Sequence, residues 1–343
     1  MAEWATFVVV PEVGGHLITE SRFGAVDLDL DLLAGPEVFV PFARAQADAG
    51  GRWRDDVWCE GAALVDLAAR VLLVFAWEGP STTMRLRAAT LELLRLAWPG
   101  WEVRWAYDGP ADLLRHLGLD PAPVRDPDRE VHAGYPAEPG DEELAESDPL
   151  LTVVTIGPDR CHLVSAASRH PIAEGPALVD RLAGAYGYGS CALPVGSGLH
   201  VDPRRRTVGW WLLDSEAEAY EMARRWPGWT VEFWQDRWEE HVRAAAGRFV
   251  PPPVDRRSAL DEVRADAWEH WSGPRGGVLL DLVRGITGVD PGARFGGAFL
   301  PVLPEGLADR ALPVLEAAWR AAVDRGAVGV ERSAVGGAGV PVE

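Results

Sequence analysis

The chain contains no lysine and no asparagine, and the absence of lysine removes specific chemistry. Without lysine there can be no Schiff base, no phosphate-binding lysine of the Walker type and no serine–lysine dyad. The three cysteines, Cys59, Cys161 and Cys191, are odd in number and lack the spacing of metal ligands. A disulfide framework and a zinc knuckle are therefore not expected. We predict three buried thiols and no cofactor.

Long hydrophobic runs and positive charge are also scarce. No run of about 18 apolar residues is available to cross a membrane, and the first residues lack a basic segment leading an apolar one. We therefore expect a cytoplasmic protein. Lysine and arginine total 33 against 52 aspartates and glutamates, which gives a net charge of -19. Because nucleic acids and anionic membranes attract basic surfaces, we expect neither as a partner.

What the chain does contain is a duplicated motif. Trp98, Pro99, Gly100 and Trp101 recur as Trp226, Pro227, Gly228 and Trp229. At the same spacing Asp108 matches Asp236 and Arg115 matches Arg243. Proline stops a helix and glycine takes backbone angles that other residues resist, while each flanking indole can bury about 150–250 Å². The motif predicts a packed corner between a helix and a strand; a stacking platform for a ligand is the alternative.

Two weaker matches extend the repeat toward the N-terminus. Ala62–Trp77 lies over Gly198–Leu213 with Asp66 on Asp202, and Thr6–Ile18 can be set on Thr152–Val164. The second of these alignments places His16 over His162. Alternating apolar hairpins resemble one another easily, so this is the weakest match.

The repeat, together with a length of 343 residues, predicts an α+β protein with more than one core. We expect two tandem pseudo-repeat units, each a mostly antiparallel sheet with helices on one face, and a helical C-terminal segment. The expected divisions are a first unit over 1–119, an acidic proline-rich linker over 120–150, a second unit over 151–247, a mainly helical segment over 248–330 and a flexible tail over 331–343.

Local patterns give further expectations. A short apolar run predicts a strand near Val38–Phe42. Helices are expected at Thr82–Ala97, Ser215–Arg225, Ala259–Trp271, Val278–Ile286 and Leu307–Arg325.

Four residues at matched positions are candidates for chemistry. His16, His162, Asp66 and Asp202 could form a metal or acid–base site at the junction of the units. The alternative is structural, because an aspartate followed by arginine is typical of a polar turn and histidines often lie in strands without a catalytic role. In the alignment of the two units, Glu240-His241 of the second corresponds to Asp112-Leu113 of the first. No acid–histidine pair is therefore kept in both copies.

Asp27, Asp29 and Asp31 alternate with leucines, and in an extended segment they would share one side. Such a row could gather a divalent cation, although Leu32 and Val38 stand where a calcium-binding EF-hand loop needs glycine and glutamate. A solvated strand face is the alternative, and no metal is predicted.

No motif specifies a reaction, and the residues resemble no family whose function could be carried over. We therefore expect a non-catalytic acidic factor, immunity- or antitoxin-like, that neutralises a basic protein partner; the acidity and the 16 tryptophans suit an interface. Two alternatives stay open. One is a hydrolase with its site at the junction of the repeats, and the other is a small-molecule-binding protein.

Overall fold

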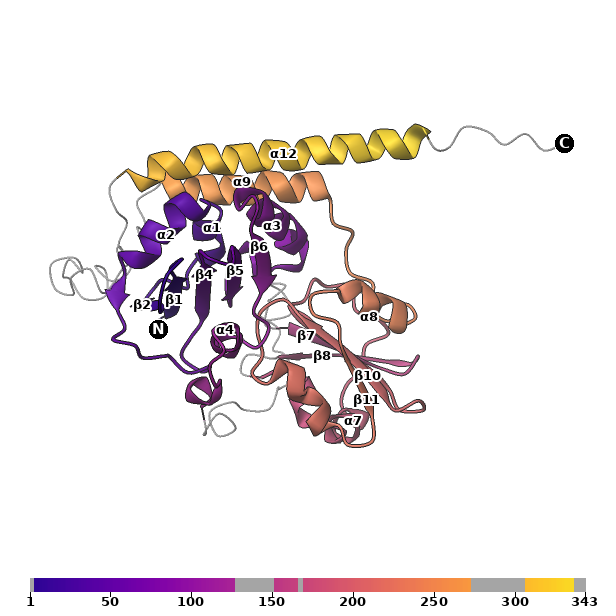
Figure 1. The fold of residues 1–343 in the computed structure, drawn as a ribbon. Helices are drawn as coiled ribbons and strands as arrows, with labels where there is room; N and C mark the ends of the chain where they lie inside the picture. Colours follow the sequence, from indigo (N-terminus) through magenta and orange to yellow (C-terminus); the bar gives the residue numbers. More distant parts are fainter. Residues whose placement is uncertain (1–2, 127–150, 166–168, 273–305, 336–343) are drawn as a thin grey trace, which may run out of the picture.

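The computed structural model describes residues 3–126, 151–165, 169–272 and 306–335. These residues form two sheets with helices packed against them, followed by a pair of long helices (Figure 1). The α+β class with two tandem units is therefore confirmed. Within the described residues, no helix is both long enough and apolar enough to span a bilayer.

The first unit holds a six-stranded sheet in the order β3-β2-β1-β4-β5-β6. Its strands are β1 (Ala5–Val10), β2 (Leu17–Ser21), β3 (Ala47–Asp48), β4 (Gly61–Asp66), β5 (Val71–Ala76) and β6 (Glu102–Trp105). Its helices are α1 (Leu28–Leu32), α2 (Pro36–Arg44), η1 (Pro80–Thr82), α3 (Met84–Ala97), α4 (Pro110–His116) and η2 (Ala122–Val124). Helices α1, α2 and α3 contribute to the main core on one face, and α4 packs on the other face.

The second unit holds a five-stranded sheet in the order β11-β10-β9-β7-β8. Its strands are β7 (Leu151–Ile156), β8 (Arg160–Ser165), β9 (Ser197–Asp202), β10 (Thr207–Leu212) and β11 (Thr230–Phe233). Its helices are η3 (Pro171–Glu174), α7 (Ala177–Ala183), η4 (Ala219–Arg225) and α8 (Trp238–Ala244).

The two sheets share one topology. In each, two antiparallel hairpins are joined by a parallel pair, β1 with β4 and β7 with β9. A final strand then pairs in parallel with the second hairpin, β6 with β5 and β11 with β10. The helix between these last strands is α3 in the first unit, but in the second unit the corresponding segment forms the shorter 3-10 helix η4.

The Trp-Pro-Gly-Trp motif lies at the end of that helix in both units. Trp98 and Trp226 are fully buried, and their indole N–H groups donate to Leu32 O at 2.7 Å and Ile172 O at 2.8 Å. The second tryptophan of each motif is half-buried and meets the first edge-on, with ring centroids 5.0 Å and 5.1 Å apart. The buried anchor is thus the first tryptophan of each motif.

Gly100 and Gly228 supply the backbone geometry of this corner. Their φ angles are 81° and 77°, in the left-handed region where a side chain is strained. The strand after each glycine then begins with an amide donating to the carbonyl of Arg70 or Arg206, at 2.8 Å and 2.9 Å. The same hydrogen bond therefore forms the corner in both copies.

Two local expectations are wrong. Val38–Phe42 lies inside helix α2, which begins with Pro36 after Gly35, so the apolar residues lie on a helix that packs on the sheet. The alignment of His16 with His162 is also wrong. The pairing of β1 with β4 and of β7 with β9 makes Phe7 the counterpart of Val154. Phe7 pairs with Thr19 and Val154 pairs with His162, so Thr19 is the structural counterpart of His162.

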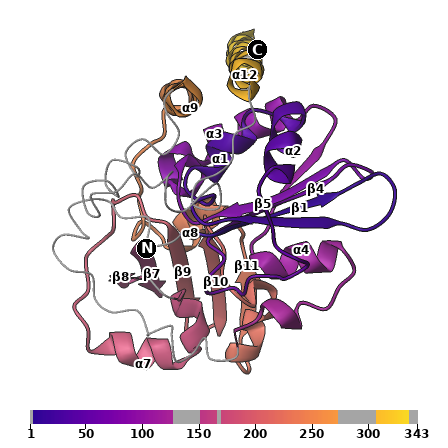
Figure 2. The same ribbon diagram turned by 90° about the vertical axis from the view of Figure 1, so that its left-hand side faces the viewer.

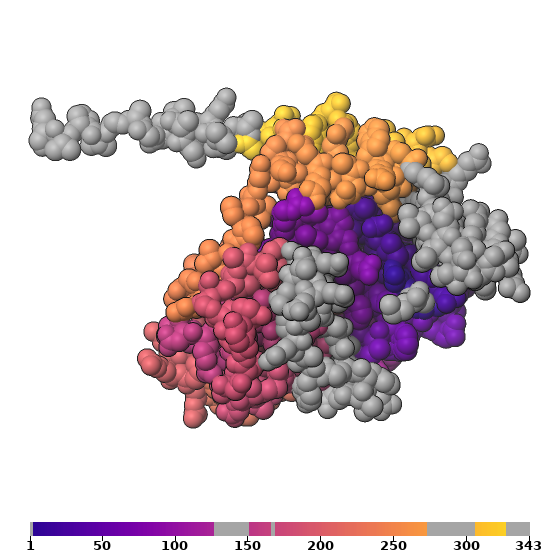
Figure 3. Space-filling model, turned by 180° about the vertical axis from the view of Figure 1, so that it is seen from behind, coloured from indigo at the N-terminus to yellow at the C-terminus, as the bar shows by residue number. Residues whose placement is uncertain are grey.

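After the second unit, α9 (Arg256–Ser272) and α12 (Leu307–Val335) return to the first unit and pack on each other and on α3 (Figure 1 and Figure 2). In the space-filling view they form a layer over the first unit (Figure 3). The helix expected at 278–286 and most of the acidic linker lie outside the described residues. Helix α12 continues to Val335, so the expected tail over 331–343 begins inside a helix.

Candidate functional site

The four matched candidates His16, His162, Asp66 and Asp202 do not build one site. His16 is exposed in the β1–β2 turn, whereas His162 is buried in β8 with its Nδ1 atom 3.0 Å from Tyr186 O. Asp66 is the last residue of β4, and its Oδ2 atom lies 3.0 Å from Nε2 of His116 in the same unit. Asp202 ends β9 and accepts from the amides of its own turn. Across the described ranges, no three histidine, cysteine or acidic side chains gather so as to hold a metal ion.

The aspartates of the 27–31 segment are structural. This segment forms helix α1 rather than an extended strand, so the three carboxylates do not line one side. Asp29 is buried and accepts from Ser81 N at 2.7 Å, and burial raises its pKa to about 6. Asp31 is buried against His270 of α9, with Oδ1 2.7 Å from Nε2. The segment therefore attaches neighbouring elements to one another.

The junction between the units is closed by buried charges. The Asp108 carboxylate has no exposed surface. It accepts hydrogen bonds from Arg115 at 2.5 Å, from Arg125 at 2.6 Å and from the backbone amide of Glu218 in the second unit at 2.7 Å. Arg87 crosses in the opposite direction and donates to Leu213 O at 2.9 Å. Groups of both units thus satisfy the Asp108 carboxylate, whereas the buried Arg87 Nη2 atom has no hydrogen-bond partner over the ranges that the structure describes. The junction is an interface between cores.

A different set of polar side chains runs through the interior of the second unit. Trp211 Nε1 lies 3.1 Å from His241 Nδ1, His241 Nε2 lies 2.7 Å from Thr155 Oγ1, and Thr155 Oγ1 lies 2.8 Å from His200 Nδ1. The first three side chains are completely buried, and His200 is partly exposed. Strands β7, β9 and β10 and helix α8 each supply one member of this polar chain. Gly198 leaves the necessary space, since a Cβ there would lie 2.3 Å from Trp211 Nε1.

The direction of the polar chain follows from its first member, because an indole N–H can only donate. His241 Nδ1 must therefore accept, which leaves the proton on Nε2 and gives it to Thr155 Oγ1. We assign the threonine proton to His200 Nδ1, the other hydrogen-bond partner of Thr155 Oγ1 among the described residues, and this places the His200 proton on Nε2. Burial supports these neutral forms: it lowers the pKa of His241 well below its usual value and also lowers the pKa of His200.

The first unit has an apolar cluster at the same places. The strand register and the matched helices α4 and α8 show which residues of the two units are equivalent. The polar chain Thr155, His200, Trp211 and His241 corresponds, in that order, to Val8, Leu64, Phe75 and Leu113. Those four side chains belong to one buried hydrophobic cluster. Because the fold is built without polar groups there, and buried polar groups cost free energy unless they are satisfied, packing alone does not account for the polar chain.

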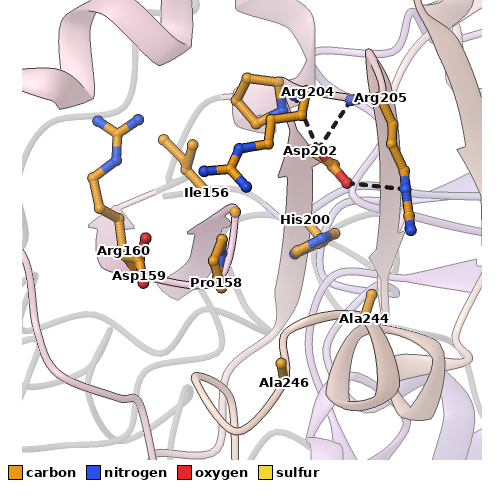
Figure 4. Close-up of a pocket in the computed structure, with 12 residues that line it drawn as sticks. Ile156, Pro158, Asp159, Arg160, His200, Asp202, Arg204, Arg205, Ala244 and Ala246 are labelled. Carbon is orange, nitrogen blue, oxygen red and sulfur yellow. Dashed lines mark hydrogen bonds and ion pairs between the residues drawn. The ribbon is translucent and has the colours of Figure 1, made fainter.

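The polar chain ends at a pocket with a volume of about 440 Å³ (Figure 4). The pocket is formed by the β7–β8 turn, the β9–β10 turn and the end of α8. His200 lines it together with the charged residues Asp159, Arg160, Asp202, Arg204 and Arg205. The apolar part of the lining includes Pro158, Pro203, Ala244 and Ala246.

This arrangement makes His200 a hydrogen-bond donor. Its Nδ1 atom is occupied by Thr155, and its Nε2 atom carries the proton, so the neutral ring has no free lone pair with which to act as a general base. A ligand that offers an acceptor to Nε2 is therefore suited to the site. The geometry favours hydrogen-bond donation by His200 over action as a general base.

Sequence reasoning missed this site although its signal was present. The comparison of the copies sets His241 opposite Leu113, but we used that difference only to exclude a shared acid–histidine pair. A polar residue where the other copy has a core leucine was the informative feature. Of the three partners of His241, only Thr155 was hidden by the β1 and β7 alignment, which was displaced by one residue. His200 and Trp211 were already aligned with Leu64 and Phe75, but nothing in the sequence linked them to His241.

No family model matches this chain, and neither a curated protein nor a solved structure matches it.

Proposed function

We propose that this protein is a non-catalytic binding protein that holds a small, acceptor-rich ligand in the pocket of its second unit. The observation that supports this most is the Trp211–His241–Thr155–His200 chain, which takes the place of an apolar cluster in the first unit. It holds one ring N–H at a pocket that is large enough for a small molecule. The small-molecule alternative from the sequence is thus favoured, with the site inside one unit.

The test uses a variant that the duplication itself provides. His200→Leu introduces the residue that the first unit carries at the equivalent position, Leu64, which is fully buried there. Wild-type protein and the variant are each incubated with a metabolite extract, washed and denatured, and the released molecules are identified by mass spectrometry. We expect anionic small molecules from the wild type, with at least a tenfold lower yield from His200→Leu.

The matched control is His16→Leu, which removes an exposed histidine of the first unit. It should release the same molecules as the wild type. Equal release from wild type and His200→Leu, with both proteins folded, would overturn the proposal.

A second candidate function rests on charge. The net charge of -19 supports an acidic factor, immunity- or antitoxin-like, that neutralises a basic protein in the cytoplasm. This function predicts co-purification of a basic polypeptide that weakens as salt is raised from about 0.1 M to 1 M, because the screening length falls from about 10 Å to 3 Å. Purification without any partner at every salt concentration would count against it.

A further inference from the structure

We propose that the ligand of the second-unit pocket is a small phosphate monoester. This inference rests on the proposed function, but other residues carry it: the arginines of the pocket, which the polar chain does not include. Arg160 follows the β7–β8 turn, and Arg204 and Arg205 belong to the β9–β10 turn.

Two of these arginines lack an acidic partner. Arg205 lies 3.7 Å from Asp202, whereas Arg160 and Arg204 form no ion pair within the described part of the chain. In Figure 4 the Arg204 side chain turns away from Asp202 and toward Ile156. The lining residues therefore include three arginines against two aspartates, Asp159 and Asp202, with the Arg205 side chain 83% exposed. In a chain of net charge -19, this local excess of positive charge favours an anionic ligand.

The fold does not require these arginines. At the equivalent places the first unit has Leu17, Ala68 and Ala69. The turn is nevertheless the same, because Asp66 accepts from Ala69 N at 2.8 Å as Asp202 accepts from Arg205 N at 3.1 Å. All three arginines are thus particular to the unit that also carries the polar chain.

The number of donors distinguishes a phosphate from a carboxylate. One arginine fork satisfies a carboxylate, whereas a phosphate monoester has up to two negative charges and three strong acceptor oxygens. Guanidinium groups from two turns and the His200 Nε2–H together match the larger set.

The remaining space is suited to an organic group. A volume of about 440 Å³ lies in the range of about 300–1,000 Å³ typical of small-molecule sites and exceeds what a bare phosphate ion fills. The Pro158, Pro203, Ala244 and Ala246 side chains provide apolar walls for the esterified part.

Isothermal titration calorimetry on the full chain tests the assignment with four probes: inorganic phosphate, glucose 6-phosphate, adenosine monophosphate and gluconate. We expect at least one of the two esters to bind at least tenfold more tightly than inorganic phosphate and gluconate. The triple variant Arg160→Leu, Arg204→Ala, Arg205→Ala carries the residues of the first unit and should weaken ester binding at least tenfold. Arg224→Ala, at a largely exposed arginine outside the pocket lining, is the matched control and should leave it unchanged.

The outcomes separate this inference from the proposed function. Gluconate binding as tightly as the esters, with loss in His200→Leu, would overturn the phosphate assignment and leave the binding function standing. Ester binding that the triple variant leaves unchanged would also overturn it, because the arginines would then take no part. If none of the four probes binds, the phosphate assignment is wrong, and the metabolite release from wild type and His200→Leu decides the proposed function separately.

Discussion

Replacing Trp98 by alanine is expected to lower the free energy of unfolding by about 3–5 kcal/mol, and Trp226→Ala is expected to cost a similar amount. Both indoles are fully buried beneath the corner between a helix and a strand, and each donates a hydrogen bond to a backbone carbonyl that would keep only its bond from the amide of Gly35 or Gly175. Urea unfolding followed by far-ultraviolet circular dichroism measures the loss for each variant.

Trp268→Ala is the matched control, since this indole on α9 is 43% exposed. Its cost should be about 0.5 kcal/mol, as for surface substitutions. A loss of several kcal/mol in Trp98→Ala but under 1 kcal/mol in Trp226→Ala would show that the two corners are not equivalent.

Acidification from pH 7 to pH 5 is expected to destabilise the second unit and to stabilise the first. Burial lowers the pKa of His170 to about 3 and that of His241 well below its usual value, and both histidines lie in the second unit. A depressed folded-state pKa gives stability that is complete above the unfolded value of about 6.5 and is lost as pH falls below it. Between pH 6.5 and pH 5 the loss for His170 should be on the order of 1–2 kcal/mol, and His241 should change stability in the same direction.

The first unit carries buried carboxyl groups whose pKa shifts have the opposite effect on stability. Burial raises the pKa of Asp29 to about 6, and burial with the nearby Glu3 and Glu78 charges raises the pKa of the half-buried Glu60 to about 7. A raised folded-state pKa gives stability that is complete below the unfolded value and is lost as pH rises through the folded one. Lowering the pH from 7 to 5 therefore restores it.

Hydrogen exchange of peptides from each unit, corrected for the intrinsic effect of pH, measures the two opening free energies. His170→Leu is the informative variant, because the first unit has Leu30 at the equivalent place beneath its corner. It should reduce the pH dependence of the second unit by one histidine's share. Equal pH dependence in both units of the wild type would contradict the account.

The sequence allowed the duplication to be predicted, because Trp-Pro-Gly-Trp lies at a position where backbone geometry and burial leave few alternatives. Gly100 must take a positive φ, and the first indole must fill the space under the helix end. The hairpin Ala62–Trp77 could also be aligned, since Asp66 and Asp202 end equivalent strands.

Elements without such a fixed point were harder to predict. The apolar run Val38–Phe42 fits a strand or a buried helix, and the core it packs against decides for α2. Similarly, Asp27–Asp31 alternates in sequence but forms helix α1, because its leucines pack into the same core.

The candidate site could not be assembled from the sequence because its members are distant along the chain. Thr155, His200 and Trp211 come from three strands and His241 from a helix, and only the strand register brings them together. Each residue alone is an ordinary strand or helix residue. The comparison of the two units in the correct register is what identifies them as a set.

Nitrogen-15 NMR of histidine-labelled protein tests the central claim most directly, because it reports which ring nitrogen carries the proton. At pH 7 we predict that His200 and His241 are both neutral with the proton on Nε2, and that saturation with a bound phosphate ester shifts the His200 Nε2 signal while the signals of exposed His16 stay in place. A His200 ring protonated on Nδ1, or a His200 signal unmoved by a ligand that calorimetry shows to bind, would contradict the account.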